Sequence, residues 1–280
     1  MTFDRRITPA RPEVAAAHLR GQVEAARFAE GRRHAVVVPV VPLRPEPRED
    51  RGIDTQLLFG ETLMIYESDA EGWSWGQADR DGYVGWVPGA ALGPPDPGPV
   101  THKVAALRSF VFPGPSIKLP TDLALPFGAR LRVEALEGAF ARVGAGFVWA
   151  GHLREVDGIE ADAVAVAERF VGVPYLWGGC SSLGLDCSGL VQLALGAAGI
   201  AAPRDTDLQE AALGSPVPTG APLLRGDLVF WRGHVGMMRD GAELLHANGH
   251  TMTVAAEPLA SACRRIEDAG GGPVTSIRRL

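Results

Sequence analysis

One cysteine stands where a nucleophile would be placed, at the start of an apolar helical pattern. Cys187 follows the glycine-rich loop 178–184, and the residues after it carry the apolar stripe of a helix. Free N–H groups and the positive end of the dipole at a helix start stabilise a thiolate, lower its pKa and can bind an oxyanion. We therefore expect Cys187 to be a nucleophile with a lowered pKa, although a lone cysteine before an apolar helix is more often a buried core residue. The loop is not typical of nucleotide binding, since no Gly-Lys-Ser/Thr follows it.

Two histidines follow on the strands of an expected hairpin, where a base for the cysteine could lie. A two-residue loop would put His234 and His246 on opposite faces of the hairpin. A three-residue loop over 240–242, with its glycine in the left-handed conformation, pairs Gly236 with His246 and puts both imidazoles on one face. We predict this register, with His234 as general base and His246 as its orienting partner. Asn248, directly across from His234, is the alternative partner.

A metal site is the first competing interpretation of these side chains. The potential ligands are Cys180, Cys187, His234, His246 and His250. They lack Cys-x-x-Cys and His-Glu-x-x-His spacing, so we expect neither a metal nor an organic cofactor. The three cysteines are too few for a disulfide framework, and Cys180 is expected to be inert, with a regulatory disulfide as the alternative.

Composition excludes several classes of protein. The chain has 280 residues, a formal net charge of −6 and 46% hydrophobic side chains, so it is expected to fold and offers no basic surface for nucleic acid. The sequence has no apolar run as long as the ~20 residues that a membrane span needs. No apolar stretch typical of a signal peptide follows the first 11 residues, and we therefore expect a cytoplasmic protein.

The patterning divides the chain into five segments. They are an N-terminal extension over 1–34 with a weak helical pattern at 13–30, a β-rich unit over 35–93, a Pro/Gly linker over 94–99, a second β-rich unit over 100–155, and a mixed unit over 156–280. The mixed unit has helical patterns at 162–171 and from Asp186 onward, then four strand patterns starting at Asp227, His234, Glu243 and Thr251. Helices followed by consecutive strands predict an α+β fold with an antiparallel sheet.

The two β-rich units have similar order along the chain. Each contains a lead strand, a Pro-containing loop, a strand after a Phe-Gly pair, and then a hairpin. The Phe-Gly pairs are Phe59-Gly60 and Phe127-Gly128. We predict a diverged repeat of a small barrel.

Residues 160–260 resemble the NlpC/P60 cysteine peptidases in five strings that occur in one order. These are Pro174-Tyr175-Leu176-Trp177-Gly178-Gly179, Leu185-Asp186-Cys187-Ser188-Gly189-Leu190-Val191-Gln192, Arg225-Gly226-Asp227-Leu228-Val229-Phe230, His234-Val235-Gly236 and Leu245-His246-Ala247. The preceding units resemble bacterial SH3 domains through Gln56-Leu57-Leu58-Phe59-Gly60-Glu61 and Asp81-Gly82-Tyr83-Val84-Gly85-Trp86-Val87. The resemblance implies a papain-like catalytic domain preceded by two small all-β SH3-like barrels.

The resemblance also implies a substrate and a reaction. Members with SH3 units in front include endopeptidases that hydrolyse the γ-D-glutamyl bond to a diamino acid in free murein peptides with an unblocked N-terminal L-Ala. The expected partner is therefore a murein tri- or tetrapeptide, with no nucleic acid and no membrane, and the sequence does not define an oligomeric state. In the catalytic unit, the matching positions place Asp186 and Ser188 in the γ-D-Glu subsite, Tyr175 beside Cys187 near the oxyanion, and Trp177 along the groove.

The ammonium of the substrate would need a carboxylate partner. The segment Arg204-Asp205-Thr206 matches a family segment whose acid meets this amine, so Asp205, with Thr206 beside it, is expected to have that role. Glu61 and Tyr83 of the first SH3 unit are weaker candidates for the same pocket, and Glu61 could equally be a solvated turn acid.

Two other functions remain open. A wall hydrolase acting on intact peptidoglycan outside the cell would use the same residues, and the missing signal sequence argues against it. An SH3-type binding protein with an inactive peptidase unit would account for the barrels, but all three catalytic candidates are present.

Overall fold

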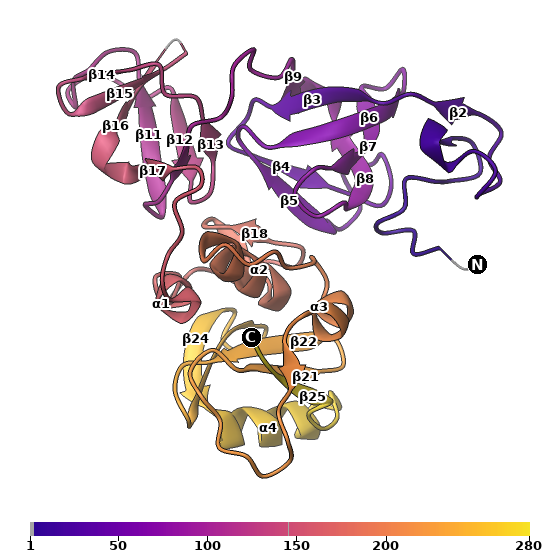
Figure 1. Ribbon diagram of the computed structural model, residues 1–280, viewed down its shortest axis with the longest axis vertical. Coiled ribbons are helices and arrows are strands. Elements are labelled where there is room, and N and C mark those ends of the chain that lie inside the picture. Colours follow the sequence, from indigo (N-terminus) through magenta and orange to yellow (C-terminus); the bar gives the residue numbers. More distant parts are fainter. Residues whose placement is uncertain (1–2, 145) are drawn as a thin grey trace. The chain divides into compact units, whose positions relative to one another are not determined.

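The computed structural model describes residues 3–144 and 146–280 and divides into two compact units, 1–158 and 159–280 (Figure 1). The first unit contains the N-terminal extension and the two β-rich segments, and the second contains the mixed segment. No helix among these described residues is long and apolar enough to cross a membrane.

The N-terminal extension does not form the helix that its weak pattern indicated over 13–30. It forms the short strand β1 (Ala15–Ala16), the 3-10 turn η1 (Ala17–Leu19) and β2 (Phe28–Ala29), which pairs in parallel with β1. Gly21, with φ +81°, reverses the chain directly after η1, a conformation that ends a helix. The extension therefore continues as irregular chain against the first barrel.

The extension is fixed by aromatic side chains of the first barrel. The Arg11 guanidinium lies over the rings of Trp75 and Trp86, 5.1 Å and 4.7 Å from their centroids. Val14 is fully buried against the same two rings. Cation–π and apolar contacts thus take the place of helical periodicity in ordering this segment.

The first barrel consists of short antiparallel strands. They are β3 (Arg32–Val36), β4 (Val40–Leu43), β5 (Thr55–Leu58), β6 (Thr62–Ser68), β7 (Trp73–Ala78), β8 (Val84–Pro88) and β9 (Leu92–Gly93), with η2 (Gly89–Ala91) before the last. The main sheet has the order β8-β7-β6-β3-β9, and β4 pairs with β5. The continuous apolar run 36–41 is divided between the end of β3 and the start of β4, because Pro39 between them has no N–H for a ladder.

The second barrel repeats this architecture with shorter strands. They are β10 (His102–Val104), β11 (Arg108–Phe112), β12 (Leu123–Pro126), β13 (Arg130–Leu131), β14 (Ala135–Glu137), β15 (Phe140–Val143), β16 (Gly146–Trp149) and β17 (Leu153–Glu155), with η3 (Ala150–His152) before the last. The strands form sheets of order β12-β11-β16-β15-β14 and β13-β10-β17.

The predicted repeat is confirmed by matching backbone hydrogen bonds. Gly60 N–H donates to the Val36 carbonyl, and Gly128 N–H donates to the Val104 carbonyl, each over 2.9 Å. Both glycines have positive φ, +76° and +86°, which a side chain would strain. Each barrel then ends with a 3-10 turn and a short closing strand, η2–β9 in the first and η3–β17 in the second.

The second unit is the α+β domain that the pattern predicted. Its helices are α1 (Ala163–Glu168), α2 (Cys187–Ala197), α3 (Thr206–Ala212) and α4 (Leu259–Asp268). Its six-stranded antiparallel sheet has the order β20-β25-β21-β22-β23-β24. These strands are β20 (Ser215–Pro216), β21 (Leu228–Trp231), β22 (His234–Met238), β23 (Glu243–Asn248), β24 (Thr253–Pro258) and β25 (Ser276–Arg279), and a separate short hairpin joins β18 (Cys180–Ser181) to β19 (Gly184–Leu185).

Helices α2 and α4 cover opposite sides of this sheet (Figure 1). On the α4 side, Ala262 packs with Val229, Trp231, Met238 and Leu244 in one apolar cluster. Successive side chains of a strand point to opposite faces of the sheet. The strands that follow α2 therefore contribute side chains to two separate layers, one on each face. The sequence pattern did not predict α4, β20 or β25.

Candidate active site

Cys187 is the first residue of α2, as expected. Its side chain is nearly buried, with 6% of the residue exposed. Asp186 caps the helix by accepting a hydrogen bond from the Gly189 N–H over 2.7 Å. Gly189 has no side chain because a Cβ there would lie 2.2 Å from the Gly179 carbonyl oxygen. The close packing of loop against helix start therefore fixes the direction in which the cysteine points.

Burial decides the pKa of Cys187. Removal from water raises the pKa of the thiol to about 12, and the Asp186 carboxylate contributes to the rise. Backbone N–H groups of Val235 and Ser188 and the charge of Arg204 lower the pKa, but these effects are smaller. The expectation of a lowered pKa is therefore wrong. The helix-start N–H does act on the sulfur, but desolvation is the larger effect.

The predicted register of the histidine hairpin is confirmed. Met237 pairs with Leu245 and Met238 with Leu244, which is the register of a three-residue loop and puts His234 and His246 on one face. The detail of the loop differs from the prediction, since Gly241 is not in the left-handed conformation. Instead the Asp240 carboxylate accepts hydrogen bonds from the backbone N–H groups of residues 242 and 243, which closes the turn without a positive φ.

The two imidazoles are in direct contact. His234 Nε2 lies 2.9 Å from His246 Nδ1, and His246 Nε2 lies 2.9 Å from Glu257 Oε1. Val235, the residue after His234, directs its backbone N–H at the sulfur of Cys187. The start of β22 thus joins the cysteine to the histidines.

Asn248, the alternative partner of His234, has another role. Its Oδ1 accepts hydrogen bonds from the backbone N–H groups of His250 and Thr251, over 3.1 Å and 2.8 Å. These bonds hold the turn between β23 and β24. The side chain that contacts His234 is therefore His246.

Both histidines are uncharged at neutral pH. The pKa of His234 is lowered to about 3, mainly by burial, with smaller contributions from electrostatic repulsion by His246 and Arg265. Burial also lowers the pKa of His246 to about 4, against the opposing effect of the Glu257 carboxylate. The resting site therefore contains a neutral thiol and neutral imidazoles rather than a thiolate–imidazolium pair. A base in this state can accept the proton of the thiol as the sulfur attacks.

Glu257 was missed by the sequence analysis. It lies on β24, where it pairs with Leu244, and its side chain reaches His246 two positions along β23. Arg265 on α4 forms an ion pair with the same carboxylate oxygen. The diagonal spacing in an antiparallel pair could have indicated Glu257 only once the β23–β24 register was known.

Tyr175 lies near the cysteine, and Trp177 lies at the surface. Burial raises the pKa of Tyr175 to about 12, with further contributions from Cys187 and Asp186, so the hydroxyl stays protonated close to the sulfur. Trp177 is 71% exposed. The Tyr175 backbone bridges to Leu185, two residues before Cys187, and the roles of both aromatic residues toward a substrate stay predictions.

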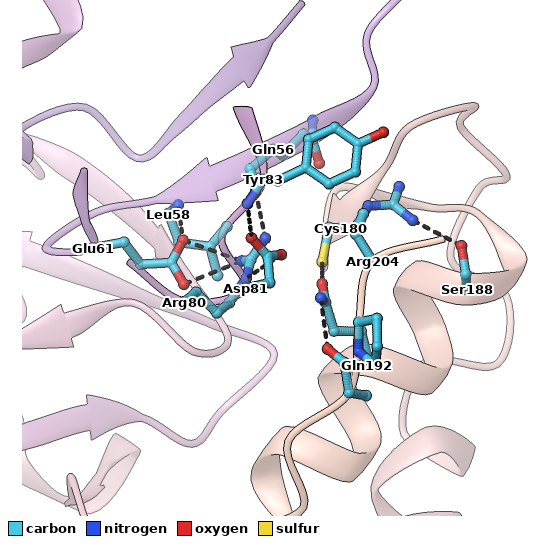
Figure 2. Close-up of polar contacts among 12 residues, drawn as sticks. Gln56, Leu58, Glu61, Arg80, Asp81, Tyr83, Cys180, Ser188, Gln192 and Arg204 are labelled. Carbon is cyan, nitrogen blue, oxygen red and sulfur yellow. Dashed lines mark hydrogen bonds and ion pairs between the residues drawn. The ribbon is translucent and has the colours of Figure 1, made fainter. Parts of the chain in front are cut away.

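Asp186 and Ser188 are joined to a buried arginine. Arg204, 1% exposed, donates to both carboxylate oxygens of Asp186 over 3.0 Å and 2.6 Å. Figure 2 shows its further hydrogen bond to Ser188 Oγ, over 2.8 Å. Burial disfavours the charged arginine, but Asp186 outweighs it and raises the pKa of Arg204. Asp186 also accepts from the Gly178 and Gly189 N–H groups. The Asp186 carboxylate is thus hydrogen-bonded by donors within the protein. The role of Asp186 and Ser188 in a γ-D-Glu subsite stays a prediction.

Asp205 and Thr206 form the start of α3. Asp205 occupies the N-cap position, and its side chain makes no capping hydrogen bond to the helix. Gln209, one turn later, donates instead to the carbonyls of Ser188 and Pro203 and ties α3 to the cysteine helix. The expected ammonium-binding role of Asp205 is not tested by these contacts.

Glu61 and Tyr83 belong to the first unit, and neither is solvated. Glu61 is 4% exposed, forms an ion pair with Arg80 over 3.1 Å and accepts from the Leu58 N–H over 2.9 Å (Figure 2). The solvated-acid interpretation of Glu61 is therefore wrong. Tyr83 is also 4% exposed and lies in the core of the first barrel. Whether either contributes to substrate binding stays a prediction.

The remaining cysteines and the potential metal ligands lie apart from the histidine pair. Cys180 is fully buried, and its Sγ lies 3.2 Å from Gln192 Oε1 (Figure 2). All three cysteines are free thiols, so the disulfide alternative is not formed. Across the part of the chain that the structure describes, no three His, Cys, Asp or Glu side chains gather as a metal site.

The fold and the site together define a class of protein. A cysteine at the start of a buried helix, packed on an antiparallel sheet that carries its histidines, is the arrangement of a papain-like cysteine peptidase. The first barrel is a bacterial SH3-like domain, and the second barrel repeats its backbone arrangement.

Comparison with known proteins assigns the family. Residues 172–265 match the NlpC/P60 family, and residues 43–92 match the bacterial dipeptidyl-peptidase SH3 domain. The chain is 30% identical over 221 residues to the gamma-D-glutamyl-L-lysine dipeptidyl-peptidase of Bacillus subtilis strain 168, covering 71% of this chain and 73% of that protein. The chain therefore belongs to the NlpC/P60 family of cysteine peptidases.

Other relatives cover less of the chain or show only its fold. Dipeptidyl-peptidase 6 of Lysinibacillus sphaericus is 35% identical over 101 residues, which are 35% of this chain and 36% of that protein. The crystal structure of an NlpC/P60 family protein from Bacillus cereus ATCC 10987 superposes with a TM-score of 0.74 at 20% identity, covering 89% of this chain and 99% of that chain. The resemblance thus extends through the barrels as well as the peptidase unit.

Proposed function

We propose that this protein hydrolyses the γ-D-glutamyl–diamino acid bond of free murein tri- and tetrapeptides that carry an unblocked N-terminal L-Ala. The observation that carries the proposal is the contact between His234 Nε2 and His246 Nδ1, 2.9 Å, beside the buried thiol of Cys187. The similarity to a gamma-D-glutamyl-L-lysine dipeptidyl-peptidase over most of both chains supports the substrate class.

The neutral resting site supports a reaction in which proton transfer accompanies attack. Cys187 Sγ forms a bond to the γ-carbonyl carbon while its proton passes to His234. The oxyanion would be held by the backbone N–H at the start of α2, with the protonated Tyr175 hydroxyl close by. Protonated His234 then donates to the leaving amine as the C–N bond breaks. Water attacks the thioester and gives a proton to His234, and His234 passes that proton to the sulfur as the C–S bond breaks and L-Ala-D-Glu is released.

Low pKa values of the histidines support the timing of this transfer. An imidazolium is unfavourable in the buried site, so His234 holds the proton only while the oxyanion is present to balance its charge. Returning the proton to the leaving amine is then favourable. Burial also keeps Cys187 and His234 uncharged before substrate binds.

The unblocked N-terminus is the finer part of the proposal. An ammonium removed from water needs a carboxylate, and Asp205 at the start of α3 remains our candidate for it. Glu61 already has Arg80 as a partner, which makes it a weaker candidate. We further propose that the protein acts in the cytoplasm, since a preference for free peptides suits the recycling of material already released from the wall.

Three substrates test the proposal. Purified protein is given equal amounts of L-Ala-γ-D-Glu-meso-diaminopimelate, its N-acetylated form and intact peptidoglycan, and products are followed by mass spectrometry. Cleavage of the free peptide at least about 100-fold faster than the acetylated one is expected if the pocket binds the ammonium. Equal rates on the first two, or release from intact wall, would contradict the proposal and indicate a wall hydrolase.

The role of Asp205 has its own matched pair of variants. Asp205→Asn should lose most of the preference for the free N-terminus, whereas Asp207→Asn, on the exposed face of the same helix, should keep it. The ratio of kcat/KM for free and acetylated peptide is the measurement. An unchanged ratio in Asp205→Asn would remove this residue from the pocket.

A further inference from the structure

The hydrogen-bonded line that begins at His234 does not end at His246. His246 Nε2 lies 2.9 Å from Glu257 Oε1, and Arg265 Nη2 reaches the same oxygen. His246 is fully buried, while the side chains of Glu257 and Arg265 are 23% and 26% exposed. Four side chains from β22, β23, β24 and α4 therefore meet in one row.

The carboxylate fixes which nitrogens carry hydrogen. A carboxylate only accepts, so His246 must hold its hydrogen on Nε2, where it faces Glu257. His246 Nδ1 is then an acceptor, and the hydrogen in the contact with His234 must come from His234 Nε2. The Nδ1 atom of His234 is left with the lone pair that a base requires.

Arg265 makes the carboxylate necessary rather than merely helpful. A guanidinium only donates, and Arg265, which reaches the same Glu257 oxygen from α4, lies close enough that its charge lowers the pKa of His246. Without the carboxylate, Arg265 would favour a lone pair on His246 Nε2 and a hydrogen on His246 Nδ1. His234 would then have to accept at Nε2 and carry its hydrogen on Nδ1, which blocks the base.

We propose that Glu257, held by Arg265, is a positioning residue that sets the tautomers of His246 and His234 and thereby leaves His234 Nδ1 unprotonated for Cys187. This inference rests on the proposed function, because it assigns His234 as the base. Glu257 and Arg265 would thus support Cys187, His234 and His246 without touching the substrate.

Kinetics of three variants test the proposal. Glu257→Ala should lower kcat at least about 100-fold with little change in KM, by analogy with other active sites in which the wrong tautomer of a catalytic histidine is imposed. The double variant Glu257→Ala, Arg265→Ala should regain at least about tenfold over Glu257→Ala, because the donor that imposes the wrong tautomer is gone. Glu243→Ala, which breaks a surface ion pair with Arg239 just after β22, is the matched control and should keep full activity.

Urea unfolding of each variant gives the fraction folded in the assay, so that kcat is taken per folded molecule. A kcat of Glu257→Ala within threefold of the parent, or a double variant no better than Glu257→Ala, would overturn the proposal. Recovery of kcat per folded molecule cannot come from restored folding, so it reports the tautomer rather than relief of the unpaired Arg265 charge.

Histidine tautomers can also be read without any turnover. Two-bond ¹⁵N–¹H correlation spectra of Cys187→Ala protein, with Glu257 intact, should show hydrogen on Nε2 of both His234 and His246. Hydrogen on Nδ1 of either one would overturn the proposal. If the parent protein cleaves no murein peptide but the spectra show the expected tautomers, the proposed function fails and the assignment of Glu257 stands.

Discussion

Two buried polar networks lie on either side of Cys187, and they handle charge in opposite ways. Asp186 and Arg204 form a charged, two-point ion pair inside the protein, with further donors from the loop and the helix start. His234 and His246 are buried as neutral groups, with pKa values of about 3 and 4. One network keeps full charge out of water, and the other keeps its two histidines uncharged.

The difference follows from what each network has to do. A buried ion pair is tolerable when every lone pair and hydrogen has a partner, and such a pair holds a fixed geometry. A group that must receive and return a proton cannot be saturated in that way, because its second protonation state would be inaccessible. Charge therefore fixes the loop and helix that present the cysteine, and neutrality keeps the histidines available.

Removing the base should have the largest effect. His234→Ala is expected to lower kcat about 10⁴-fold, since the neutral thiol then has no acceptor for its proton. His246→Ala should lower kcat less, because His234 remains and only its orientation is freed. Rates on L-Ala-γ-D-Glu-meso-diaminopimelate give the comparison, and a larger loss in His246→Ala would reverse the assigned roles.

Breaking the ion pair should mainly affect stability. Arg204→Met leaves the Asp186 carboxylate buried without its main partner and is expected to cost about 3–5 kcal/mol in the free energy of unfolding. Arg225→Met removes a more exposed partner of Asp162 and Glu168 and should cost under about 1 kcal/mol. Urea unfolding followed by tryptophan fluorescence measures both, and equal losses would mean that burial of the Asp186 pair carries no special cost.

The thiol itself should report the neutral resting state. With its pKa raised to about 12 by burial, Cys187 should be alkylated by iodoacetamide slowly at pH 7, and the rate should rise about tenfold per pH unit up to pH 9. Peptide mapping by mass spectrometry separates Cys187 from Cys180 and Cys263. A plateau of the Cys187 rate between pH 5 and 7 would instead indicate a thiolate–imidazolium pair.

The smallest effect is a pH dependence of stability. The folded pKa of His246, about 4, lies below the ordinary value of about 6.5 for an unfolded histidine, so the unfolded chain binds more protons between these pH values. Stability should therefore fall as pH falls from about 6.5 to 5. His246→Gln should make this fall shallower, while His250→Gln, at an exposed position, should not. Identical slopes in urea unfolding for His246→Gln and the parent would contradict the low pKa.

The parts of the site that depend on local pattern were predictable from the sequence. The period of two along a strand and the length of the loop at 240–242 are enough to bring His234 and His246 to one face. The Phe-Gly pairs likewise predicted the repeat, because Gly60 and Gly128 occupy the same left-handed position. Both inferences use spacing over a few residues.

The parts that depend on distant segments were not predictable. Arg204 lies 18 residues after the Asp186 it contacts, and its burial depends on the packing of a loop that has no periodic pattern. Glu257 requires the β23–β24 register, and Arg265 requires α4, a charged helix with only Ala262 fully buried. The pKa of Cys187 was predicted in the wrong direction for the same reason, since the helix start is local but burial is produced by the whole domain.

One measurement tests the central claim, that Cys187 is the nucleophile of a murein-peptide peptidase, most directly. Parent protein, Cys187→Ala and Cys180→Ala are each incubated with L-Ala-γ-D-Glu-meso-diaminopimelate, and release of L-Ala-D-Glu is quantified by mass spectrometry. Both cysteines are buried, so the two variants are matched in the size and setting of the change. Cys180→Ala should keep its activity and Cys187→Ala should have none; release of L-Ala-D-Glu by Cys187→Ala at the parent rate would show that Cys187 is not the nucleophile.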